Sequence, residues 1–100
     1  MPAKLRWHPE AAADLQLAAD WYRAQDDGAR LVARFERAVG RELEHVARAP
    51  ERWPVVRERY RQKVFAGPFP YALIYRVEDG TVFLVAVAHQ RRRPGHWTGR

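Results

Sequence analysis

The side chains best suited to chemistry gather near the end of the chain, directly after a long apolar run. Three consecutive arginines follow one histidine and precede a second histidine and a tryptophan: His89, Arg91, Arg92, Arg93, His96 and Trp97. Arginine stabilises the charge on a phosphate under attack, histidine can transfer a proton, and an aromatic ring can stack on a base. The cluster therefore suits recognition of RNA, cleavage of a phosphodiester, or contact with an acidic partner.

Further cations are candidates to join this cluster. Four precede the apolar run and one lies at residue 100, where it would join if the tail folds back: Arg57, Arg59, Arg61, Lys63 and Arg100. A nuclease built on this chain would use Arg61, Lys63, His89 and Arg91. Two simpler interpretations stay open, namely a solvated basic terminus and a docking patch for an acidic protein.

Other kinds of site are not predicted. His89 and His96 have no third ligand at a recognisable spacing, so we expect no metal site. The sequence also lacks cysteine, a glycine-rich phosphate loop and a serine nucleophile motif. We therefore expect no bound cofactor.

The positive charge is confined to the second half of the chain. Residues 1–50 carry eight cationic and eight anionic side chains, whereas residues 51–100 carry ten and four, which accounts for the net charge of +6. All the cations except Lys4 and Lys63 are arginine, which binds phosphate and carboxylate groups bidentately. This distribution favours a polyanionic or acidic partner for the second half.

Residues 1–100 are predicted to form a single domain, because a chain of this length can bury one modest core. No apolar run is long enough to span a membrane, and the first residues do not form a signal-peptide pattern. The absence of cysteine fits a reducing compartment. We therefore expect a cytoplasmic protein with no membrane partner.

The first quarter of the sequence predicts a strand and a helix. Lys4–Trp7 alternates as a short strand does, and Pro9 suits the first position of a helix. Apolar residues along that helix form a main stripe and a second one through Leu17 and Trp21. The second stripe predicts that the helix contacts two neighbours.

A second helix follows a polar break, with Asp26 or Asp27 as its cap and Pro50 and Pro54 beyond its end. One face is apolar. The opposite face carries four arginines and one glutamate: Arg30, Arg34, Arg37, Arg41 and Glu44. The two helices should form an antiparallel hairpin.

The remaining elements read as strands. Arg61–Phe65 predicts one strand, and Phe69–Val77 and Thr81–Ala88 predict a hairpin around the turn signal Asp79-Gly80. Counting back from that turn places residues in the following pairs: Val77 opposite Val82, Tyr75 opposite Leu84, Leu73 opposite Ala86 and Tyr71 opposite Ala88. The fold class is therefore α+β, in the order β-α-α-β-β-β, with the helical hairpin packed on a small, mainly antiparallel sheet.

These segments also carry a resemblance to a known family. The stretches that carry the resemblance are spread over nearly the whole chain: Trp7-His8-Pro9-Glu10-Ala11, Asp14-Leu15, Ala19-Asp20-Trp21-Tyr22, Phe35 and Leu43, Pro50-Glu51-Arg52-Trp53-Pro54, Phe69-Pro70-Tyr71-Ala72-Leu73-Ile74-Tyr75, and the run from Val85 to Trp97. In this order and spacing the chain resembles the RelE/ParE superfamily of bacterial toxins from type II toxin–antitoxin modules, and within it the ParE, or plasmid-stabilisation, branch.

The resemblance implies the β-α-α-β-β-β fold and a toxin neutralised by a cognate antitoxin, whose acidic or amphipathic C-terminal segment wraps the toxin, in some cases within a heterotetramer. ParE-like members poison DNA gyrase. RelE-like members cut mRNA on the ribosome. A non-toxic remnant that still binds antitoxin is a third possibility.

The residues that match the family's nucleases are incomplete. Arg61 and Lys63 fall where those enzymes place strand lysines, and Arg91 matches an arginine at the end of the last strand. At the position where the nucleases carry a further arginine, this chain has Ala72. At the position of their C-terminal tyrosine, it has Trp97. Because two groups for phosphate binding and proton transfer are missing, the sequence favours gyrase inhibition, with His89, Arg91, Arg92, Arg93, His96 and Trp97 as the contact surface.

Overall fold

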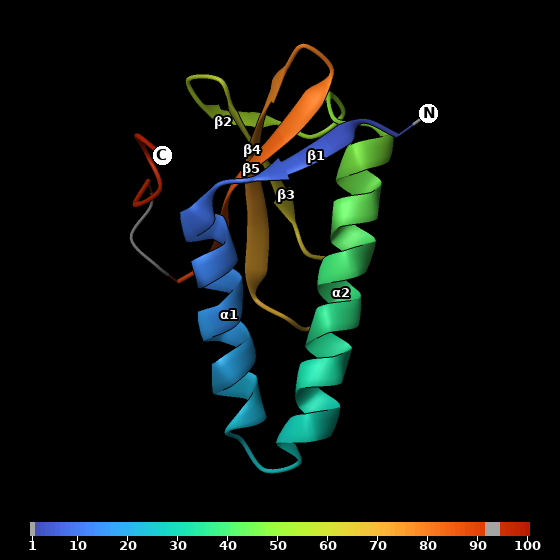
Figure 1. Cartoon of the computed structure of the whole chain (residues 1–100), viewed down its shortest axis with the longest axis vertical. Helices are drawn as coiled ribbons and strands as arrows, with labels where there is room; N and C mark the ends of the chain where they lie inside the picture. The colour runs from blue at the N-terminus through green and yellow to red at the C-terminus, as the bar shows by residue number, and fades with distance from the viewer. Residues whose placement is uncertain (1, 92–94) are drawn as a thin grey trace.

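The computed structural model describes residues 2–91 and 95–100. Within these residues there are two helices and five strands: β1 (Lys4–Trp7), α1 (Pro9–Arg23), α2 (Gly28–Arg48), β2 (Val55–Arg57), β3 (Tyr60–Val64), β4 (Tyr71–Glu78) and β5 (Thr81–His89). Figure 1 shows α1 and α2 side by side across one face of the sheet. The predicted α+β class is confirmed, with β2 as a strand that the sequence did not reveal.

The five strands form one sheet in the order β1-β5-β4-β3-β2. β1 runs parallel to β5, and every other neighbouring pair is antiparallel. The first and last strands of the chain are thus neighbours, with Lys4 opposite Thr81 and Trp7 opposite Leu84. β5 is an interior strand along this stretch, as its apolar sequence predicted.

The helical hairpin turns sharply at Gly28. A β-carbon at this position would overlap the backbone carbonyl of Arg23, so the turn requires glycine. Asp27 occupies the capping position of α2 in the left-handed conformation, with φ of 59°, and its side chain makes no capping hydrogen bond. At the start of α1, the ring of His8 accepts a hydrogen bond from the backbone N–H of Glu10, at 3.1 Å.

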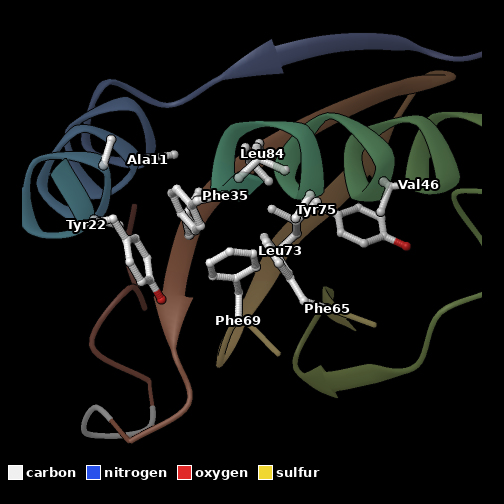
Figure 2. Packing of buried hydrophobic residues seen from close by; sticks show 14 of the residues in the cluster. Ala11, Tyr22, Phe35, Val46, Phe65, Phe69, Leu73, Tyr75 and Leu84 are labelled. Carbon is white, nitrogen blue, oxygen red and sulfur yellow. The ribbon is translucent and has the colours of Figure 1, made fainter. Parts of the chain in front are cut away.

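The main core lies between the helices and the sheet. Figure 2 shows aromatic residues meeting there, with Tyr22 and Phe35 from the helices facing Phe69. The rings of Tyr22 and Phe35 have centroids 4.9 Å apart, and Phe69 lies 5.2 Å from Tyr22. Burial of such rings is a large stabilising contribution for a domain of this size.

A β-bulge in β5 changes the predicted register of the hairpin. The pairing is as predicted near the turn, up to Tyr75 opposite Leu84, but Ile74 then lies opposite Ala86, so Val85 is the additional residue. The predicted pairs of Leu73 with Ala86 and of Tyr71 with Ala88 are therefore wrong. A bulge reverses the alternation of the side chains that follow it.

The bulge redistributes the last residues of β5 between the two faces of the sheet. Val87 joins the core beneath the helices. Val85, Ala86 and Ala88 instead belong to a second cluster, which also contains Tyr60 and Trp97. The tail residue Trp97 thus covers the sheet face opposite the helices.

Tyr75 fixes the chain where it leaves α2. Its side chain is fully buried, and its hydroxyl donates a hydrogen bond to the carbonyl oxygen of Pro50, at 2.6 Å. Burial raises the pKa of Tyr75 to about 12, against a smaller lowering effect of Arg61. The neutral phenol is therefore the form that the folded state accepts.

Replacing Tyr75 with phenylalanine is expected to reveal this titration. The folded pKa lies above the ordinary value of 10.0, so the contribution of Tyr75 is complete below pH 10 and is lost as the pH rises through 12. We expect Tyr75→Phe to lower the free energy of unfolding by about 1–2 kcal/mol at pH 8, since the Pro50 carbonyl loses its partner. The difference should shrink between pH 10 and 12, as measured by urea denaturation. A difference that stays constant to pH 12 would contradict this account.

Candidate functional site

A cleft opens on the sheet face opposite the helices. Its volume is about 250 Å³, and it is lined by residues of β2 to β5 and of the tail: Val56, Arg57, Gln62, Ala72, Ile74, Ala88, His89, Gln90, Gly95, His96 and Trp97. Three of the six residues of the predicted contact surface, His89, His96 and Trp97, border this cleft. The cleft is therefore the candidate functional site.

Small side chains create the floor of the cleft. Ala72 lies opposite Ala88, and the bulge at Val85 is what turns Ala88 toward this face. Ile74 completes the apolar floor. A larger side chain at residue 72, such as the arginine that related nucleases carry there, would occupy part of this space.

The walls of the cleft come from β2 and from the tail. The guanidinium of Arg57 packs so closely on Gly95 that a side chain at that position would overlap it. Arg57 also donates a hydrogen bond to the hydroxyl of Thr98, at 3.3 Å. One cation that the sequence linked to the cluster, Arg57, therefore lies at the cleft.

The predicted contact residues differ in how accessible they are. Arg91 is exposed, and its backbone N–H donates to Nδ1 of His89 at 3.1 Å. The His89 ring also packs edge-on against Tyr71, with centroids 5.1 Å apart. Trp97 is buried against Tyr60, with centroids 4.9 Å apart. Arg92 and Arg93 lie outside the described residues.

Arg61 and Lys63 do not join the cationic cluster. Both lie on the helix-facing side of β3, and neither lines the cleft. Arg61 donates to the backbone carbonyls of Glu51 and Trp53, at 3.0 and 2.7 Å. Of the four residues of the hypothetical nuclease, His89 borders the cleft and the other three do not.

Lys63 forms a buried ion pair with α2. Its ammonium group lies 2.5 Å from Oε1 of Glu42, donates to the carbonyl of Val64 at 2.8 Å, and faces the ring of Trp53. The second oxygen of Glu42 accepts from the backbone N–H of Ala66, at 3.1 Å. Lys63 therefore has a structural role in this fold and does not line the cleft.

Arg100 takes a different place from the one that the sequence suggested. The tail does fold back, but the guanidinium of Arg100 inserts between carboxylates of α1 rather than joining the arginines. It lies 2.7 Å from Asp14 and 3.0 Å from Glu10, and it donates to the carbonyl of Val85 at 3.0 Å. Asp14 is itself buried and accepts from the backbone N–H of Val87, at 3.2 Å.

Sequence reasoning missed the two buried carboxylates, although a signal was present. Asp14 falls between Ala11 and Ala18 at the spacing of the buried face of α1, and Glu42 falls in the same way between Val39 and Val46 on α2. A charged residue inside an apolar stripe needs a buried partner of opposite charge. That partner is Arg100 in one case and Lys63 in the other.

The comparisons with known proteins agree with this architecture. Residues 5–94 match the family described as ParE toxin of type II toxin-antitoxin system, parDE. The chain belongs to the ParE toxin family. The sequence thus encodes a ParE-type toxin of a type II toxin–antitoxin system, as its resemblance indicated.

Among solved structures, the toxin is similar in fold to a chain from "Chromosomal ParDE TA system from P. aeruginosa". The two share 17% sequence identity with a TM-score of 0.75, over 87% of this chain and 95% of that chain. No curated protein matches the sequence. None of the helices in the described part of this toxin is both long and apolar enough to cross a membrane.

The structural role of Lys63 can be tested by removing one or both charges. Lys63→Met leaves Glu42 buried without its partner, so we expect a loss of about 3–5 kcal/mol in the free energy of unfolding. Lys63→Met combined with Glu42→Leu should recover most of that loss, because no lone charge remains. Chemical denaturation measures both effects. Equal destabilisation by the single and the double variant would contradict the ion-pair account.

Proposed function

We propose that this toxin inhibits DNA gyrase by protein contact, through the cationic end of the sheet. The contact surface comprises His89, Arg91, Arg92, Arg93, His96 and Trp97. The observation that carries the proposal is that the candidate nuclease residues do not converge on the cleft, which His89 borders and Arg61, Lys63 and Arg91 do not. Arg61 and Lys63 are engaged in internal contacts beneath the helices, so they do not supply charge to the cleft.

The ribosome-dependent nuclease is the weaker alternative. Cleavage of a phosphodiester requires a proton-transfer group and charge stabilisation at the same phosphate. Of the four residues that such an enzyme would use, His89 alone borders the cleft, and the floor beside it consists of Ala72 and Ala88. A hollow of this composition suits a side chain of a partner protein better than the chemistry of cleavage.

Arg91 is the exposed arginine of this surface within the described residues. The hydrogen bond from its backbone to His89 fixes the point where the chain leaves β5. Gln90, the residue before Arg91, lines the cleft, so an exposed arginine follows a preformed hollow with an apolar floor, and arginine is among the residues that dominate many protein interfaces. A gyrase segment with an acidic residue beside an apolar one would fit this arrangement.

We also propose that a cognate antitoxin neutralises the toxin through an acidic or amphipathic C-terminal segment. Two apolar surfaces support this. Leu17 and Trp21 of α1 are 61% and 60% exposed, so the second neighbour that their stripe predicted is not found among the described residues. Val55 and Val56 are exposed on the edge strand β2, where an extended segment can add to the sheet. An antitoxin helix on α1 and a strand at β2 would cover both, in a cytoplasmic complex that can be a heterotetramer.

A supercoiling assay with purified gyrase tests the target. We expect the toxin to inhibit supercoiling at micromolar concentration. Arg91→Ala should weaken inhibition at least about tenfold, since an anchor arginine at an interface contributes well over 1 kcal/mol. Arg6→Ala, which removes an exposed arginine of β1, is the matched control and should leave inhibition unchanged.

Three results would point elsewhere. Full supercoiling at micromolar toxin would remove the gyrase proposal. Cleavage of mRNA in a translating extract, abolished by Arg91→Ala, would favour the nuclease. Normal growth on induction, together with antitoxin binding, would indicate a non-toxic remnant.

Antitoxin binding is tested by co-purification with the product of the neighbouring reading frame. Trp21→Ala should weaken the complex at least about tenfold, because an exposed tryptophan that becomes buried is a typical hot spot. Val64→Ala removes a comparably exposed apolar side chain from β3 and serves as the control. Equal affinities for the toxin and for Trp21→Ala would show that α1 does not bind the antitoxin.

A further inference from the structure

The outward face of α2 carries arginines that neither the core nor the cleft uses. Five exposed side chains form this arginine stripe: Arg30, Arg34, Arg37, Arg41 and Arg48. At 3.6 residues per turn and 1.5 Å per residue, they fall within about 60° of arc along about 27 Å of the helix. The buried face of α2 holds the helix against the sheet, so the arginines of the stripe project from one continuous helix (Figure 1).

The centre of the stripe has no internal counter-charge. Arg30 lies 3.6 Å from Asp27, and Arg48 lies 2.7 Å from Glu44. Within residues 2–91 and 95–100, no ion pair forms at the three arginines between them: Arg34, Arg37 and Arg41. Like charges three or four positions apart on a helix repel one another. A bound polyanion would relieve this repulsion.

The surroundings of the stripe distinguish among polyanions. A protein interface needs a dehydrated apolar or aromatic centre, yet all the large exposed apolar side chains of the described residues lie on other elements: Leu17, Trp21, Val55, Val56 and Val64. Single-stranded nucleic acid is held by aromatic rings that stack on its bases, and α2 exposes no tryptophan, tyrosine or phenylalanine ring. The backbone of a duplex requires neither, because its phosphates are bound through charge alone.

We propose that the arginine stripe of α2 binds the phosphate backbone of double-stranded DNA without reading its sequence. Guanidinium groups repeat along the helix every three to seven residues, and each can bind a phosphate bidentately. The choice of DNA over duplex RNA rests on the proposed function, since gyrase itself holds duplex DNA. The stripe gives the toxin a second contact, apart from the cleft, with a DNA-bound target.

Fluorescence anisotropy with a labelled DNA duplex of mixed sequence tests this proposal on the whole chain without gyrase. The stripe variant replaces Arg34, Arg37 and Arg41 with glutamine. The control variant replaces three exposed arginines elsewhere with glutamine: Arg6, Arg23 and Arg52. It therefore has the same net charge as the stripe variant. The arginines that follow β5 remain in both variants.

We expect the stripe variant to lose at least about tenfold in affinity at low salt. The slope of log K against log salt should fall by about 2.7 in magnitude, because three phosphate contacts are lost. The control variant should stay close to the parent protein. Thermal unfolding of the stripe variant should occur at the parent's temperature or above it, since repulsion on α2 is removed, which shows that the variant is folded.

Several outcomes would overturn the proposal. These are equal losses in the two variants, no binding of duplex DNA by the parent chain, tighter binding of single-stranded DNA or duplex RNA, and a preference for polyglutamate over DNA. The supercoiling assay separates this proposal from the function. A toxin that inhibits gyrase without binding DNA would refute only the proposal that the stripe binds DNA. A toxin that binds DNA without inhibiting gyrase would refute only the gyrase proposal.

Discussion

β5 continues past the end of β1, so the backbone N–H and C=O groups of its last residues have no strand partner on that side. The rest of the structure depends on the side chains that form hydrogen bonds with these groups. β1 ends opposite Leu84, and the bulge follows at once. Asp14 of α1 accepts the N–H of Val87, while Arg100 donates to the carbonyl of Val85 and to Asp14 itself. Unpaired backbone groups at such a site would be costly, and a lone buried Asp14 more so. This single junction positions α1, the end of β5 and the tail, so the cleft depends on it.

The second helix is anchored by the same chemistry. Glu42 reaches from α2 to Lys63 of β3 and to the backbone of Ala66, so each helix is tied to the sheet by one buried carboxylate. The consequence for function lies in where charge remains available. Lys63 and Arg100 neutralise carboxylates inside the protein, whereas Arg91 and the arginine stripe of α2 stay exposed to solvent. The fold therefore separates cations that hold the structure from cations that can meet a partner.

Much of this architecture follows from the sequence. Pro9 and the periodic apolar faces predict the helices, and Asp79-Gly80 predicts the hairpin and its register as far as Leu84. The bulge could not be predicted, because Val85–Ala88 is apolar throughout and fits either face of the sheet. β2 has three exposed residues and no burial pattern to mark it. The position of Arg100 depends on a contact 86 residues away with Asp14, which no local pattern encodes. Of the residues that the sequence offered for a site, His89, His96 and Trp97 border the cleft, whereas Arg61 and Lys63 do not.

The parallel pairing of β1 with β5 has a consequence for biosynthesis. Lys4 pairs with Thr81, so β1 cannot pair with β5 until nearly the whole chain has been synthesised. Contacts between such distant segments slow folding, and domains emerge from the ribosome N-terminus first. The helical hairpin is thus complete on the nascent chain while the sheet that covers its aromatic residues is still being translated. During that interval the apolar faces of both helices are open to a chaperone or to any partner that is already present.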